Sequence, residues 1–149
     1  MSSSVRRLLE TRFPNLKATD YEVTSLPDRN YNCFAWAAND VVRWWEPIQS
    51  PGCYWPDNVP LSYSVETYVS AYQGLGFSLC ESPDIEPGSE KLALYVKDNL
   101  PCHAARQLPD GQWTSKLGTG HDIRHSALAS LEGDEYGTVD IILKRPHSL

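Results

Sequence analysis

Hydrophobic positions in the first half of the chain follow a helical period. Residues 4–12 form a weakly amphipathic segment, and residues 64–73 form a second helical segment that ends at Gly74. Between them, residues 33–45 are apolar over a wide arc, which predicts a buried helix. Asn32 or Asn30 is the expected N-cap of that helix.

The second half of the chain reads mostly as strands. A Pro-Asp-Gly turn between two half-apolar runs predicts a hairpin over residues 103–117. A helix is expected among these strands at residues 122–131, with Asp122 as its N-cap and Gly133 as its C-cap. The other expected strands are 20–23, 77–80, 92–97 and 138–144.

This order of elements predicts an α+β fold in which the N-terminal helices pack on a small sheet of three to five mostly antiparallel strands. A chain of 149 residues fits one domain, residues 1–149. Residues 46–63 are rich in proline and are expected to form a long loop that provides one wall of a cleft.

Composition and charge limit the partners and the location. The net charge of −6 argues against nucleic acid or an anionic membrane as the main partner. The sequence contains no run of 18 apolar residues, so we expect no membrane span. The N-terminus also lacks the apolar core of a secretion signal. We therefore expect a cytoplasmic protein, with export by a route that needs no cleaved signal left open. The four cysteines match no zinc-site spacing, and we expect free thiols and no cofactor.

Cys33 is the best candidate for a nucleophile. It stands at the first turn of the expected buried helix, where the helix dipole and free backbone N–H groups favour a thiolate and can stabilise an oxyanion. Such a cysteine needs a histidine as general base, and His103 opens the first strand of the predicted hairpin. The alternative for Cys33 is plain core packing, because free cysteine is among the most buried residue types.

A family resemblance supports this pair. Asn32-Cys33-Phe34 before a buried helix resembles the nucleophile segment of papain-like hydrolases. The Glu86-Pro87-Gly88 turn, the apolar strand after it and the histidine-led hairpin at 103–117 are similar to the bacterial NlpC-type peptidases. The resemblance implies a papain-like, NlpC-like fold and a peptide or amide substrate.

The third catalytic residue has two candidates. The resemblance places the third residue of the family, usually a histidine, at Ser115, while Asp122 follows His103 at a spacing nearer to papain-like triads. A three-residue hairpin turn would put Ser115 on the same face as His103, and a two-residue turn would not.

Other residues complete the set of candidates. Asn32 is a candidate oxyanion or substrate contact, and Tyr54 and Trp55 are candidate substrate contacts on the long loop. His121 and His125, spaced like a metal-binding pair on a helix, offer a less favoured metal site.

Three functions remain at this point. The first is a cysteine hydrolase of the peptidase or amidase type, with deamidation or acyl transfer as variants of the same chemistry. The second is a binding module without catalysis on the same fold. The third is a metallohydrolase built on the two histidines.

Overall fold

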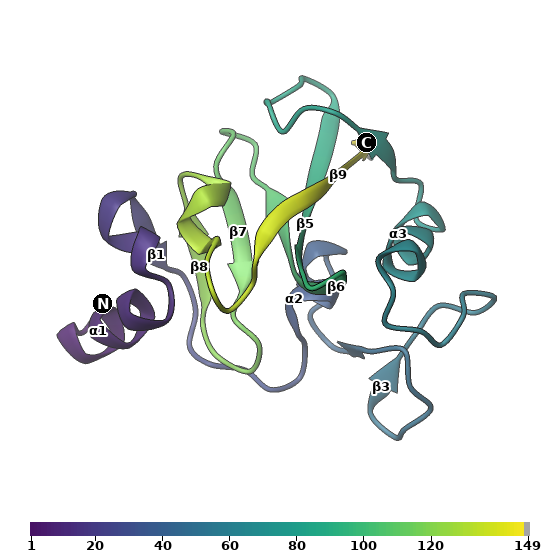
Figure 1. Cartoon of the computed structure of the whole chain (residues 1–149), viewed down its shortest axis with the longest axis horizontal. Coiled ribbons are helices and arrows are strands. Elements are labelled where there is room, and N and C mark those ends of the chain that lie inside the picture. Colours follow the sequence, from purple (N-terminus) through teal and green to yellow (C-terminus); the bar gives the residue numbers. More distant parts are fainter. Residues whose placement is uncertain (148–149) are drawn as a thin grey trace.

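A seven-stranded antiparallel sheet forms the centre of the protein in the computed structural model, which describes residues 1–147 (Figure 1). The α+β class is confirmed, and the sheet is wider than the three to five strands expected. Its order, from one edge to the other, is β1 (Tyr21–Val23), β8 (Asp122–His125), β7 (Trp113–Lys116), β6 (Leu100–Gln107), β5 (Ser89–Lys97), β9 (Thr138–Pro146) and β4 (Ser78–Cys80).

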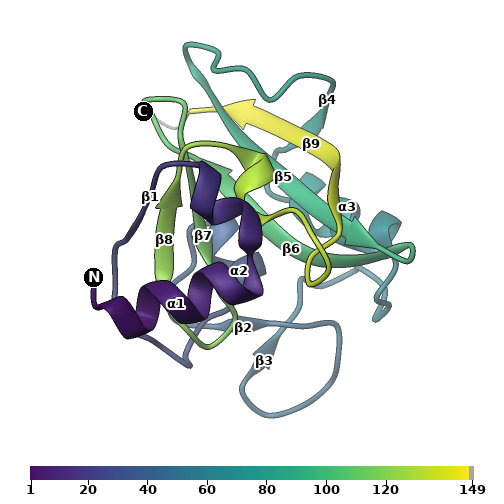
Figure 2. The same cartoon turned by 60° about the vertical axis from the view of Figure 1, so that its left-hand side comes forward.

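Helical segments cover both faces of this sheet. The helix α1 (Ser3–Arg12) and the short 3-10 helices η1 (Pro14–Ala18) and η2 (Leu128–Leu131) pack on one face, together with Tyr95 and Ala105. The helices α2 (Cys33–Ala37) and α3 (Val65–Gln73) pack on the other face, together with Leu94 and Ala104. Figure 2 shows α1 in front of β7 and β8, with α2 behind them. We call these the α1 face and the α2 face.

The predicted helix over residues 33–45 is right only for its first five residues. Asn39 takes a left-handed backbone conformation with φ of 65°, and the Asp40 carboxylate accepts the N–H groups of Val42 and Arg43. This local hydrogen bonding competes with the helix and ends it. The chain then enters β2 (Trp44–Trp45), which pairs in parallel with β3 (Cys53–Tyr54).

The predicted helix over residues 122–131 is also wrong. Asp122–His125 forms β8, paired on one side with β1 and on the other with β7, so its backbone groups are satisfied by two neighbours. Asp122 is therefore a strand residue and not an N-cap. Gly133 pairs with Gly137 in a small bridge and caps no helix.

The hairpin is confirmed, and its three-residue turn puts Ser115 on the same face of the sheet as His103. The N–H of Leu108 donates to the carbonyl of Gln112, which leaves a three-residue turn at residues 109–111. Beyond the turn the two strands separate: β6 pairs with β7 at Arg106–Thr114 and Gln107–Trp113, while β7 goes on pairing with β8 as far as Lys116. The helix α2 packs against both β6 and β7.

The other predicted elements are confirmed with small shifts in their bounds. Helix α3 begins after Ser64, whose hydroxyl accepts the N–H of Thr67, and ends at Gly74. Asn32, rather than Asn30, caps α2. Within residues 1–147, no helix has the length and hydropathy needed to cross a membrane.

Candidate active site

A chain of hydrogen bonds joins three buried side chains on the α1 face. The Nε2 atom of His103 lies 2.9 Å from the Ser115 hydroxyl, and that hydroxyl lies 2.8 Å from the Nε2 atom of His125. The Nδ1 atom of His125 lies 2.9 Å from the carbonyl oxygen of Ala127. All three side chains are fully buried. Strands β6, β7 and β8 each contribute one residue, because their inward positions line up on this face.

The chain of hydrogen bonds determines which nitrogen of each histidine carries the proton. A carbonyl only accepts, so the Nδ1 atom of neutral His125 carries the proton and its Nε2 atom is a bare acceptor. The Ser115 hydroxyl therefore donates to His125 and accepts from His103, whose proton is on Nε2. The Nδ1 atom of His103 is then an unprotonated acceptor, and it is buried without a hydrogen-bond partner among the described residues.

Both imidazoles are neutral in this environment. Burial, with smaller contributions from His125 and Arg12, holds the pKa of His103 well below its ordinary value. Burial likewise lowers the pKa of His125 to about 4. The ring of Tyr136 stacks on His103 with 4.2 Å between ring centres, and the ring of Tyr95 meets it edge-on at 5.2 Å. The site thus contains a neutral base enclosed by aromatic rings.

Cys33 is the first residue of α2, as predicted, but its thiol is buried and not activated. The side chain is 6% exposed. Burial raises the pKa of Cys33 to about 12, although backbone groups of Ala104 and Phe34 and the charge of Lys116 oppose this shift. The expected thiolate is therefore not the resting form, because a five-residue helix and a few N–H groups do not offset the loss of water.

Cys33 begins the helix that packs on the strand of His103, and no hydrogen bond joins the two side chains. The Cys33 sulfur faces the backbone of Ala104, the residue after His103. The side chain of Ala104 packs on the α2 face and the ring of His103 on the α1 face. The charge of Cys33 also raises the pKa of Tyr136, the residue stacked on His103. The sulfur therefore lies against β6 on the α2 face, and the imidazole of His103 lies on the α1 face.

Of the two candidates for the third residue, the structure brings Ser115 to His103 and places Asp122 elsewhere. Asp122 faces the α2 side of β8, where its Oδ2 atom accepts the Tyr31 hydroxyl at 2.9 Å. On the neighbouring strand, the Lys116 ammonium donates to the carbonyls of Asp28, Gly118 and Gly120. The interpretation of Asp122 as the residue that orients His103 is wrong, because Asp122 belongs to this separate charged cluster.

The proposed substrate contacts have mixed outcomes. The Asn32 side chain is occupied, since it accepts the Ala35 N–H and donates to the Trp45 carbonyl. It acts as a cap and does not point an N–H toward an oxyanion. Tyr54 packs its ring against Trp45 and under the guanidinium of Arg43.

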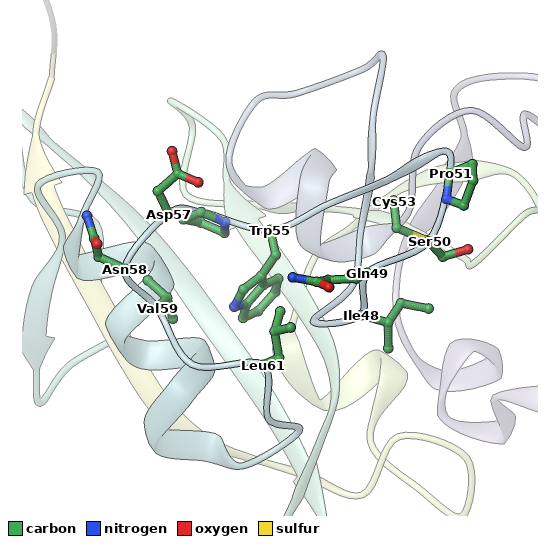
Figure 3. A pocket seen from close by; sticks show the side chains of 11 residues that line it. Ile48, Gln49, Ser50, Pro51, Cys53, Trp55, Asp57, Asn58, Val59 and Leu61 are labelled. Atoms are coloured by element: carbon green, nitrogen blue, oxygen red, sulfur yellow. The ribbon is translucent and has the colours of Figure 1, made fainter.

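Trp55 does line a pocket, of about 560 Å³, within the long loop. Figure 3 shows its indole ring among Gln49, Val59 and Leu61. The same ring packs against Tyr68, whose pKa is raised by burial and by the charge of Cys33. Trp55 and Tyr68 both belong to the aromatic cluster on the α2 face.

The metal hypothesis is not supported. His125 is held in the buried chain, and His121 precedes β8 in a turn, so the two do not share a helix face. Within residues 1–147, no group of three histidine, cysteine or acidic side chains is placed to hold a metal ion.

His125 is a partner of Ser115 that the sequence pattern did not predict. The signal was present: Trp113, Ser115, Ile123 and His125 alternate with polar residues along two strands. The predicted helix over residues 122–131 hid this signal, because in a helix His125 would not alternate with its neighbours as a strand residue does.

Comparison with known proteins gives one match. No curated protein and no solved structure matches the chain. A family model described as "Domain of unknown function (DUF7689)" matches residues 22–144, a span that includes Cys33 and the whole hydrogen-bonded chain. On this evidence the protein belongs to the DUF7689 family.

Proposed function

We propose that the protein is a thiol hydrolase or acyl transferase in which Cys33 is the nucleophile and His103 the general base. The observation that carries the proposal is the bare, buried Nδ1 atom of His103. A buried acceptor without a partner costs stability, so its retention favours a functional role. A papain-like arrangement, with a helix-borne cysteine beside a strand that carries a histidine, is part of the same proposal.

The proposed reaction begins from neutral groups. The sulfur of Cys33 attacks the carbonyl carbon of an amide or ester, and its proton passes to the Nδ1 atom of His103. The imidazolium returns that proton to the leaving amine or alcohol, and a thioester remains on Cys33. Water, or a second amine in acyl transfer, then attacks the thioester, and His103 takes the proton of the attacking group. The C–S bond breaks, the acid or new amide leaves, and His103 returns the proton to the Cys33 sulfur.

The raised pKa of Cys33 shapes this mechanism. Because the thiol and the imidazole are both neutral at rest, the proton transfers as the sulfur attacks, and no preformed ion pair is required. Substrate must also reach a buried thiol. Trp55 of the long loop packs against Trp45 on this side, and displacement of the loop is the proposed route of entry for a peptide or amide.

Acylation by p-nitrophenyl acetate tests the proposal without a known substrate. The other three cysteines are all more exposed than Cys33 and serve as internal controls. If Cys33 is the nucleophile, peptide mass spectrometry will find acetyl groups on Cys33 first, with release of p-nitrophenol. The variant His103→Gln should slow this reaction by about a hundredfold. Preferential labelling of Cys53, Cys80 or Cys102 would contradict the proposal.

The burial of the thiol favours a second candidate, a binding module without catalysis. In that case Cys33 packs as a small apolar group, and its thiol should be the slowest of the four to react. The acylation experiment separates the two functions, because they predict opposite orders of labelling.

A further inference from the structure

We infer that His125 is a positioning residue that acts through Ser115 to keep the reactive Nδ1 atom of His103 free of a proton. This inference deepens the proposed function and rests on it for its catalytic consequence. It concerns the tautomer of His103, which is measurable whether or not the reaction occurs.

The proton positions are determined from the outer end of the hydrogen-bonded chain, at Ala127. The Ala127 carbonyl can only accept, and it holds the proton of His125 on Nδ1. His125 then offers its Nε2 atom to the Ser115 hydroxyl at 2.8 Å. A serine hydroxyl has one proton, so a hydroxyl that donates to His125 must accept from His103. The carbonyl of Ala127 thus determines the tautomer of His103 through two intervening side chains.

Without His125 the serine alone does not determine the tautomer. A serine hydroxyl can donate as well as accept, and it would be free to donate to the Nε2 atom of His103. The ring proton would then sit on Nδ1, and the base facing the proposed reaction would be lost. This is why serine, a weak orienter of imidazole by itself, is sufficient here.

The surroundings favour the neutral chain. Around His103 lie the rings of Tyr95 and Tyr136 and the positive charge of Arg12, which lowers the pKa of His103. The charge of Arg124 lowers the pKa of His125. With two cations and no carboxylate among the groups that shift these pKa values, neither ring is stabilised as an imidazolium at rest.

Two-bond 1H–15N NMR spectra of uniformly 15N-labelled protein test the inference directly. We expect His103 as the Nε2–H tautomer and His125 as the Nδ1–H tautomer at neutral pH. In His125→Leu, the Ser115 hydroxyl loses its acceptor and can donate to the Nε2 atom of His103, so the Nδ1–H tautomer of His103 should become populated. In His125→Gln, the side-chain oxygen can accept in place of Nε2, and His103 should keep its tautomer. His121→Leu, outside the chain, is the matched control and should change nothing.

Acylation rates of Cys33 provide the functional readout. We expect His125→Leu to lower the maximal rate by at least about tenfold, without a change in the ester concentration at half-maximal rate, and His125→Gln to restore most of it. Wild-type His103 in the Nδ1–H tautomer would overturn the inference, even if His125→Leu fails to fold. An unchanged tautomer in a folded His125→Leu protein would overturn it too. Expected tautomers with no acylation of wild-type Cys33 would instead contradict the proposed function alone.

Discussion

Strands β7 and β8 place two buried polar clusters back to back. On the α1 face, Ser115 and His125 belong to a neutral hydrogen-bonded chain. On the α2 face, Lys116 and Asp122 belong to a charged cluster. Ser115 and Lys116 are adjacent on β7, and Asp122 and His125 are three residues apart on β8, so the pleat of the sheet directs the members of each pair to opposite faces.

The clusters differ in charge and in the groups that they bind. All three N–H groups of the Lys116 ammonium bind backbone carbonyls, which ties together the turns that contain Asp28, Gly118 and Gly120. This pattern is typical of a structural lysine. In the neutral chain every donor is used, and one acceptor, the Nδ1 atom of His103, stays open within residues 1–147, as does the Oδ1 atom of Asp122 in the charged cluster. The bonds of Lys116 to three turns indicate that the charged cluster stabilises those turns, whereas the neutral chain holds the proposed general base.

The largest expected effect comes from Lys116→Met. Removal of the ammonium leaves three carbonyls and the Asp122 carboxylate without their buried cation, so the free energy of unfolding should fall by about 3–5 kcal/mol in urea denaturation. Lys144→Met is the control, because Lys144 pairs with Glu86 at the surface and should change stability by less than about 1 kcal/mol. Equal effects of the two substitutions would contradict the structural role of Lys116.

A smaller loss is expected from Ser115→Ala. This substitution leaves two buried histidine nitrogens without partners and should cost about 2 kcal/mol in the free energy of unfolding. Ser130→Ala is the matched control. Ser130 is equally buried but donates only to Thr19, which is half-exposed and can turn to water. If Ser130→Ala costs as much as Ser115→Ala, the histidine chain contributes nothing beyond one ordinary hydrogen bond.

Acid should weaken the fold through His125. The pKa of this residue is about 4 in the folded protein and about 6.5 in the unfolded chain, so the unfolded state binds the proton first as the pH falls. Stability is then fully present above pH 6.5 and is lost progressively toward pH 4. At pH 5.5 the wild type should have lost about 1 kcal/mol more than His125→Gln, each relative to its own value at pH 7.5. Parallel pH profiles of the two proteins in urea denaturation would contradict a neutral buried His125.

Sequence patterns predicted the parts of the site that depend on local signals. The Pro-Asp-Gly turn gave the hairpin, and its three-residue geometry places Ser115 beside His103. Helix-start chemistry gave the position of Cys33 behind its Asn32 cap. Two features depend on distant contacts and could not be predicted: the pairing of β8 between β1 and β7, and the depth at which the helix start is buried. Because the strand β8 was not predicted, the role of His125 was not predicted either. Because the depth of burial at the helix start was not predicted, a lowered pKa of Cys33 was expected where the pKa is raised.

The smallest effect is expected where sequence and structure differ most, in the segment after α2. An apolar residue at Val41 fits the pattern of a buried helix, in which Val41→Ala would leave a cavity and cost roughly 2–4 kcal/mol. In the structure Val41 is 47% exposed, because the turn at Asn39 and Asp40 directs the chain outward before it returns at Trp45. Val41→Ala should therefore change the free energy of unfolding by less than about 0.5 kcal/mol. Trp45→Ala, at the buried end of the same segment, should cost about 3 kcal/mol or more. A large loss for Val41→Ala in urea denaturation would mean that the helix continues past Ala37, and the charged and neutral clusters would then be covered differently from the arrangement described.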